Sequence, residues 1–204
     1  ITPAVLTVTA NTREKTYGDA DPELTYIAKG LVGSDKLEGG LARTEGEHVG
    51  EYEINQGTLT AGSNYTIAFT AAKLTIRPLA VELTWSNTAF TYNGSEQCPA
   101  AAVSNKVNEA DQVNVTVTGG QTNAGDTPYT ASATGLTGAE AGNYTLAGCQ
   151  NTTQTFTIGK AAPTVSEIMV DSPDILYDTT ELSAITLSHT GTEGNLVLDG
   201  NQTL

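Results

Sequence analysis

The sequence predicts an all-β protein made of tandem small β-rich domains arranged end to end. Three observations predict this fold class: a composition suited to strands and turns, alternation of apolar and polar residues, and an internal repeat. Thr, Val, Ile and Tyr are common, and 21 of the 204 residues are glycine. β-Branched and aromatic side chains suit a half-buried pleated surface, whereas glycine suits turns.

The alternation is clearest in three runs: Leu6, Val8 and Ala10; Val81, Leu83 and Trp85; and Val113, Val115 and Val117. Alternate residues of a strand point to the same face of a sheet, so each run predicts a strand with one buried face. Residues 21–36 form the one stretch that could be a short helix. Leu24, Tyr26 and Ala28 alternate there as well, and we favour a strand.

The internal repeat begins with three similar runs, Ile1 to Val8, Ile76 to Leu83 and Ile158 to Val165. The isoleucines at positions 1, 76 and 158 lie 75 and 82 residues apart. Further motifs recur in the same order between these runs, which is the pattern of a duplicated unit. The corresponding motifs are Tyr17-Gly18-Asp19 with Tyr92-Asn93-Gly94, Val49-Gly50 with Ala124-Gly125, and Asn64-Tyr65 with Asn143-Tyr144.

The repeat divides the chain into residues 1–78, residues 79–160 and a partial third copy, residues 161–204. The joints between copies are short and contain Pro or Gly. A short joint with proline is stiffer than a Gly/Ser linker. We therefore expect the copies to follow one another in an elongated array.

The first copy resembles the MBG repeats of bacterial surface proteins, of the variety with a Tyr-Gly motif. The residues that carry the resemblance are Lys15-Thr16-Tyr17-Gly18-Asp19, Val49-Gly50-Glu51-Tyr52 and Asn64-Tyr65-Thr66. The second copy is similar to sister repeats with a Tyr-Asn-Gly motif, through Thr91-Tyr92-Asn93-Gly94. The resemblance implies a β-grasp-like or Ig-like sandwich fold within a long, exported, modular protein with adhesin-like or stalk roles. It brings no catalytic residues.

The formal net charge of −14 argues against partners that are themselves anionic. Phosphate backbones and anionic lipid headgroups would be repelled, so we expect no nucleic-acid partner. No apolar run approaches the ~20 residues of a transmembrane helix, so we expect no membrane insertion within this chain. The chain begins at Ile1 without a signal peptide. We expect an export signal and an anchor to lie outside it.

Candidate chemistry is sparse. The motif residues Tyr17, Gly18 and Asp19, and their counterparts Tyr92, Asn93 and Gly94, are interpreted as turn residues, with each tyrosine packed over the core and its hydroxyl in water. Asp19, Asp21 and Glu23 alternate near a turn but lack a calcium-loop pattern, and His48 and His189 lie in different copies. We expect no catalytic site, no bound metal and no cofactor.

Two covalent cross-links are considered. Cys98 and Cys149 are the only cysteines and both lie in the second copy. An exported domain with two thiols suggests one disulfide, although two free thiols are equally compatible with the sequence. Lys15, Lys73 and Lys160 lie on or near predicted strands, but nothing in the sequence identifies partners for an isopeptide bond.

The sequence therefore predicts a non-catalytic repeat module of a secreted or cell-surface protein, acting as a stalk, a spacer or an adhesion segment. Its expected partners are neighbouring repeats of the same chain, with a host or glycan ligand left open. A carbohydrate-binding module is one alternative, for which Trp85 would be the best exposed aromatic; its alternation with Glu82 and Thr84 favours the core instead. Accessory repeats of a large exported hydrolase are the other alternative.

Overall fold

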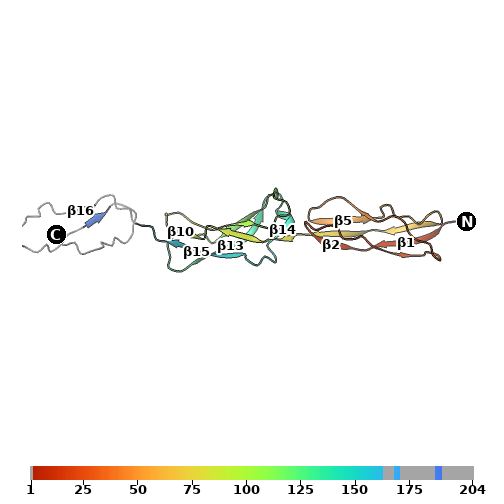
Figure 1. Cartoon of the computed structure of the whole chain (residues 1–204), viewed down its shortest axis with the longest axis horizontal. Helices are drawn as coiled ribbons and strands as arrows, with labels where there is room; N and C mark the ends of the chain where they lie inside the picture. The colour runs from red at the N-terminus through yellow and green to blue at the C-terminus, as the bar shows by residue number, and fades with distance from the viewer. Residues whose placement is uncertain (1, 163–167, 171–186, 190–204) are drawn as a thin grey trace, which may run out of the picture.

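The computed structural model describes residues 2–162, 168–170 and 187–189. Within residues 2–162, every strand pairing joins two strands on the same side of Pro78 (Figure 1). We call residues 2–78 unit one and residues 79–162 unit two. The two units lie end to end, with the N-terminus at the far end of unit one.

Unit one contains seven strands: β1 (Ala4–Ala10), β2 (Arg13–Thr16), β3 (Tyr26–Lys29), β4 (Ala42–Arg43), β5 (Gly50–Asn55), β6 (Tyr65–Thr70) and β7 (Ala72–Arg77). They form two sheets, with strand orders β3-β1-β6 and β2-β7-β5-β4. Each sheet contains one parallel pair, β1 with β6 in the first and β2 with β7 in the second. Because β1 continues into β2 and β6 into β7 after short breaks, the two pairs together run the length of the unit.

The core of unit one follows the predicted alternation. Leu6, Val8 and Ala10 are buried along β1, and their polar neighbours are exposed. Leu6 and Val8 pack with Leu59, whereas Ala10 packs with Ile54 and Leu74. The core therefore extends along the parallel pairs as two neighbouring clusters, one beneath each sheet.

Unit two contains eight strands: β8 (Leu79–Ala80), β9 (Leu83–Ser86), β10 (Ala89–Thr91), β11 (Ala100–Val103), β12 (Asn114–Thr118), β13 (Tyr129–Thr137), β14 (Tyr144–Thr145) and β15 (Thr153–Gly159). Its pairings repeat those of unit one. β8 pairs in parallel with β14, and β10 in parallel with β15. β13 lies antiparallel to β15, as β5 lies antiparallel to β7.

The all-β fold class is confirmed. Within the described residues the helical structure is one 3₁₀ turn, Ala141–Asn143. The stretch 21–36 contains β3, as the alternation indicated. Trp85 is half-buried, in contact with two core clusters of unit two, and its indole N–H donates to the Asn151 carbonyl at 2.9 Å.

The predicted domain boundaries at residues 78 and 160 remain an interpretation. β7 ends at Arg77 and β8 begins at Leu79. Strands before residue 78 pair only with one another, as do β8 to β15 after it, so the predicted boundary at residue 78 falls between two separately paired sets of strands. The predicted third domain, residues 161–204, lies outside the described residues except at its start and at two short strands. These are β16 (Ile168–Val170) and β17 (Leu187–His189), which pair antiparallel.

Phe156 offers a test of the core of unit two, since it is 1 % exposed and packs edge-to-face on Phe90. Phe156→Ala should lower the free energy of unfolding of unit two by about 3–5 kcal/mol, through lost burial and the cavity left behind. Trp85 is the only tryptophan in the chain, so its fluorescence during urea unfolding reports on unit two. Thr155→Ala, at the exposed neighbouring position of β15, should cost less than about 1 kcal/mol. Equal costs for the two variants would contradict this assignment of the core.

Candidate functional site at the joint between the units

The Tyr-Gly turn of unit one lies at the joint with unit two. β2 ends at Thr16, and the Tyr17 N–H then donates to the Arg77 carbonyl at 2.8 Å, beside the last strand. The Asp19 N–H donates to the Thr16 carbonyl at 3.0 Å and closes the turn. Gly18 has φ +91°, which side chains rarely tolerate. A Cβ there would also lie 2.6 Å from Val107 Cγ2 of unit two.

The Tyr17 side chain enters the core of unit two. It is 6 % exposed and packs edge-to-face against Tyr144, with ring centroids 5.4 Å apart. Tyr17 and Ile76 of unit one belong to one buried cluster with the following residues of unit two: Val81, Leu83, Val103, Val113, Ala133 and Tyr144. The hydrophobic core is therefore continuous across the joint.

A buried carboxylate binds both tyrosines. Asp111 is 7 % exposed, and its Oδ2 accepts hydrogen bonds from the Tyr17 hydroxyl, at 3.3 Å, and from the Tyr144 hydroxyl. The Tyr144 hydroxyl in turn accepts from the Val107 N–H at 2.9 Å. The expectation that the Tyr17 hydroxyl faces water was wrong, because its acceptor lies 94 residues further along the chain.

The ionisation of these groups suits the arrangement. The hydrogen bond from Tyr144 lowers the pKa of Asp111 despite its burial. Burial, and then the hydrogen bond to Asp111, raises the pKa of Tyr144 to about 12. Burial and the charge of Asp111 also raise the pKa of Tyr17. At neutral pH, two protonated phenols therefore donate to one ionised carboxylate.

A second set of hydrogen bonds crosses the joint at Asn143. Its Oδ1 accepts from the Val49 N–H of unit one at 2.9 Å, and its Nδ2 donates to Glu140 Oε2 at 2.8 Å. Nδ2 also lies 2.8 Å from His48 Nδ1. The joint thus brings the Val49-Gly50 and Tyr17-Gly18 motifs of unit one against the Asn143-Tyr144 motif of unit two.

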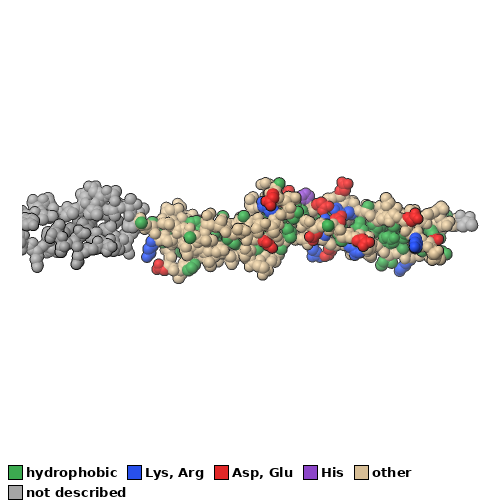
Figure 2. All heavy atoms as spheres, in the orientation of Figure 1, with side chains coloured by type: hydrophobic (Ala, Val, Ile, Leu, Met, Phe, Trp, Pro, Cys, Tyr) green, Lys and Arg blue, Asp and Glu red, His purple; other side chains and the backbone are tan. Residues whose placement is uncertain are grey.

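Next to the turn, four charged side chains form an ion-pair cluster. The Lys15 side chain is only 4 % exposed, and its ammonium lies 2.8 Å from Asp21 Oδ1 and 2.5 Å from Glu47 Oε2. Arg43 Nε lies 2.6 Å from Asp21 Oδ2, and Arg43 also pairs with Glu47. Hydrogen bonds from Arg43 and Lys15 lower the pKa of Asp21 to about 2. On the face shown in Figure 2, acidic and basic side chains are interspersed around this part of unit one.

The three acids considered for calcium have separate partners. Asp21 pairs with Lys15 and Arg43, whereas Asp19 Oδ2 accepts from the Thr16 N–H at 3.2 Å. Glu23 contributes its backbone carbonyl, which accepts from Arg13 Nε at 2.8 Å. Among the described residues, no group of three or more His, Cys, Asp or Glu side chains has an arrangement that could hold a metal ion.

The Tyr92-Asn93-Gly94 motif occupies the corresponding position at the far end of unit two. The Tyr92 N–H donates to the Gly159 carbonyl at 2.9 Å, as Tyr17 does to Arg77. Asn93 Oδ1 accepts from the Ser95 N–H at 2.9 Å, and Gly94 has φ +80°. The Tyr92 side chain is half-buried against the cluster that contains Phe156.

Cys98 and Cys149 are free thiols in the structure. Cys98 packs against the cluster with Phe156, and Cys149 packs against the cluster with Val81 and Tyr144. In the structure the two thiols thus pack in different clusters and are not bonded to each other, and the disulfide considered from the sequence stays a prediction. Of the three lysines considered for an isopeptide bond, Lys15 lies in the ion-pair cluster and Lys73 pairs with Glu51 on the surface.

Comparison with known proteins gives one match. A family model described as "MBG domain (YGX type)" matches residues 6–75, which lie within unit one. The resemblance that the sequence motifs indicated for the first copy is thereby confirmed. No curated protein and no solved structure matches the chain. Within the described residues, no helix is long and apolar enough to cross a membrane.

The ion-pair cluster predicts a loss of stability in acid. The folded-state pKa of Asp21 lies below that of an unfolded aspartate, about 3.9, so its ion pairs stabilise the fold above that pH and are lost as the pH falls towards the folded value of about 2. At pH 6 the native chain should have a higher melting temperature than the Asp21→Asn variant. The difference between the two melting temperatures should shrink between about pH 4 and pH 2. Glu45→Gln, at an exposed acid of the loop that carries Glu47, serves as the control. A difference that persists unchanged at pH 2 would contradict the assignment.

The shared carboxylate predicts that Tyr17 stabilises unit two from outside it. Tyr17→Phe keeps the ring but removes a hydrogen bond to a buried charged acceptor, and should lower the stability of unit two by about 1.5–3 kcal/mol. Trp85 fluorescence during urea unfolding measures this effect. Tyr65→Phe is the matched control within unit one, because its hydroxyl is bonded at the other end of that unit. If both substitutions leave the Trp85 transition unmoved, the two units are not coupled through Tyr17.

Proposed function

Because residues 6–75 match the family model of the YGX-type MBG domain, we propose that the chain is a non-catalytic repeat module of a secreted, cell-wall-associated bacterial protein. In that protein it acts as a stalk or spacer. The observation that carries this proposal is the joint between the units. A spacer has to hold successive domains in a fixed line. The joint supplies the contacts that such a role requires.

Three features of the joint support a stiff connection. The linker is short, because Pro78 alone separates β7 from β8 and proline has a fixed φ. The Tyr17 ring is buried in the core of unit two, so bending would expose apolar surface. Bending would also separate the buried Asp111 carboxylate from one of its donors, the Tyr17 hydroxyl, and the loss of a hydrogen bond to a buried charged group is costly.

The second candidate role, adhesion to a glycan, depends on exposed aromatic side chains. Trp85 is half-buried between two core clusters and its indole N–H is already bonded. Of the tyrosines in the repeat motifs, Tyr17 and Tyr144 are buried at the joint, and Tyr65 and Tyr92 are half-buried. This distribution favours the stalk over a carbohydrate-binding module, and a glycan array probed with the chain would test the alternative. Accessory repeats of an exported hydrolase would have the same shape, and domains elsewhere in the full polypeptide would identify that case.

Small-angle X-ray scattering tests the stalk. We expect a radius of gyration clearly above the roughly 17 Å that compact-domain scaling gives for 204 residues. A short Gly-Ser linker inserted after Pro78 should reduce the radius of gyration and broaden the distance distribution, because the joint then bends. The same linker inserted between Asp126 and Thr127, in an exposed loop of unit two, should change neither by a comparable amount.

Two outcomes would overturn the proposal. One is a radius of gyration near 17 Å for the native chain, the value of one compact domain. The other is an elongated native chain whose scattering is as insensitive to the linker after Pro78 as to the linker in the loop. The second result would mean that the joint is already flexible.

A further inference from the structure

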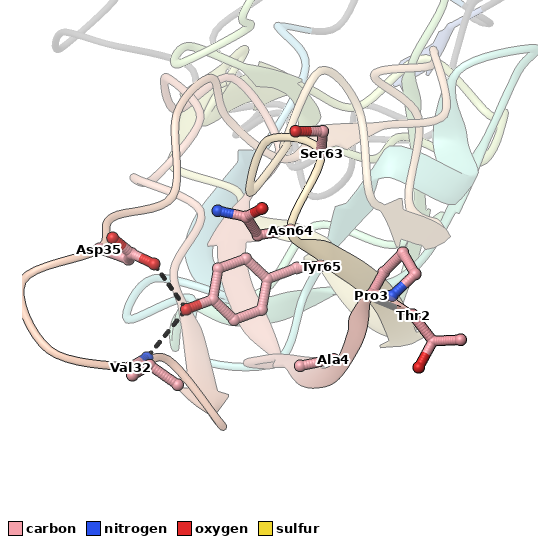
Figure 3. A pocket seen from close by; sticks show the side chains of 8 residues that line it. All are labelled: Thr2, Pro3, Ala4, Val32, Asp35, Ser63, Asn64 and Tyr65. Atoms are coloured by element: carbon pink, nitrogen blue, oxygen red, sulfur yellow. Dashed lines mark hydrogen bonds between the residues drawn. The ribbon is translucent and has the colours of Figure 1, made fainter.

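Unit one carries, at its N-terminal end, the same hydrogen-bonded group that unit two uses to bind Tyr17. Figure 3 shows the Tyr65 hydroxyl between Asp35 and Val32. The hydroxyl donates to Asp35 Oδ2 at 2.7 Å and accepts from the Val32 N–H at 3.0 Å. We call Val32, Asp35 and Tyr65 the socket of unit one.

The socket has the same three hydrogen-bonded members as the group at the joint, with Val32 and Asp35 three residues apart and Val107 and Asp111 four. In unit two, the Tyr144 hydroxyl donates to Asp111 Oδ2 and accepts from the Val107 N–H at 2.9 Å. Tyr65 and Tyr144 both open a strand that pairs in parallel with the first strand of the unit, β6 with β1 and β14 with β8. Both also follow an asparagine of the same motif. The two groups are therefore the same structural element in successive repeats.

The element in unit two is occupied by the preceding repeat. Asp111 accepts from the Tyr17 hydroxyl, and Gly18 lies against the Val107 side chain. As a result Asp111 is buried and Val107 is 39 % exposed. In unit one the corresponding Asp35 is exposed and Val32 is 67 % exposed. The carboxylate that is buried in unit two is thus exposed in unit one, and the valine beside it is more exposed in unit one than in unit two.

The open element lines a hollow of about 410 Å³, which Pro3 also borders. Pro3 precedes β1 as Pro78 precedes β8. At the joint, Pro78 follows the repeat that carries the Tyr-Gly turn. Pro3 is its counterpart beside the socket. Asp35 keeps the lone-pair capacity with which Asp111 binds a second phenol, since a carboxylate accepts several hydrogen bonds.

We propose that the socket of unit one binds the Tyr-Gly turn of an MBG-type repeat placed directly ahead of Pro3. The tyrosine hydroxyl of that repeat would donate to Asp35, its ring would pack on Tyr65, and its glycine would lie against Val32. This inference rests on the proposed stalk role and specifies it: one element, the tyrosine-bonded carboxylate, joins each repeat to the one before it.

A fusion protein tests the socket. Residues 2–77 are placed ahead of residues 3–204, so that Arg77 of the added copy is followed by Pro3 as it is followed by Pro78 in the native chain. Hydrogen exchange of residues 31–35 in the second copy, the one that begins at Pro3 behind the added repeat, is compared with that of the same residues in the native chain. We expect exchange there to slow by about tenfold or more, because docking buries the loop and removes its local opening. Residues 107–111 of the same molecule provide the reference for an occupied socket.

Substitutions on the socket side keep the test interpretable, since they lie on exposed surface of the native chain. Val32→Glu should abolish the protection that fusion confers on residues 31–35. Val5→Glu is the matched control, because Val5 is also 67 % exposed but lies outside the hollow. It should leave the protection intact.

The outcomes separate the socket from the stalk. Exchange of residues 31–35 that is unchanged by fusion, while residues 107–111 stay protected, would overturn the socket and leave the stalk proposal standing. Equal effects of Val32→Glu and Val5→Glu would also overturn it. A flexible joint at Pro78 in the scattering experiment would instead remove the stalk on which the inference rests.

Discussion

The ionised carboxylate of Asp111, held between two phenols from different repeats, is the interaction on which the elongated arrangement depends. A buried carboxylate needs donors, and here one donor, Tyr144, belongs to its own unit and the other, Tyr17, to the preceding unit. The surrounding apolar side chains exclude water and strengthen both hydrogen bonds. Separation of the units would therefore expose apolar surface and deprive a charged group of a donor at the same time.

The remaining features of the joint follow from that contact. Gly18 allows the turn to approach Val107, and the charges of Lys15 and Arg43 hold Asp21 and Glu47 beside the turn. The chain itself adds the restriction of Pro78. Each of these contributions is local, but they act on the same few residues around Tyr17. In the proposed stalk, this concentration would let a small contact between the two units restrict their relative direction.

Much of the architecture was predictable from the sequence, because period-2 alternation and recurrence are local signals. The buried face of β1, the strand at Tyr26–Lys29 and the paired motifs at Tyr17 and Tyr92 were all readable in this way. The role of the motifs was not. Asp111 and its counterpart Asp35 lie outside the motifs that the sequence analysis identified. The partner of Asp111 across the joint lies 94 residues away, so no spacing rule connects them. The available signal was chemical. The motifs place a tyrosine at positions 17 and 92, where a phenylalanine would be enough to fill an apolar core, and its hydroxyl indicates a hydrogen-bond partner.

The two parallel pairs of unit one, β1 with β6 and β2 with β7, determine how that unit would carry tension. A pull along the array acts on β1 at its start and on β7 at its end. The pairs β1–β6 and β2–β7 lie along the line of that pull, with registers from Ala4↔Tyr65 to Thr16↔Arg77. The evenly spaced hydrogen bonds of a parallel pair are then loaded in shear, so they share the force instead of opening one after another. The topology that brings entry and exit to opposite ends of the unit also gives it resistance to extension.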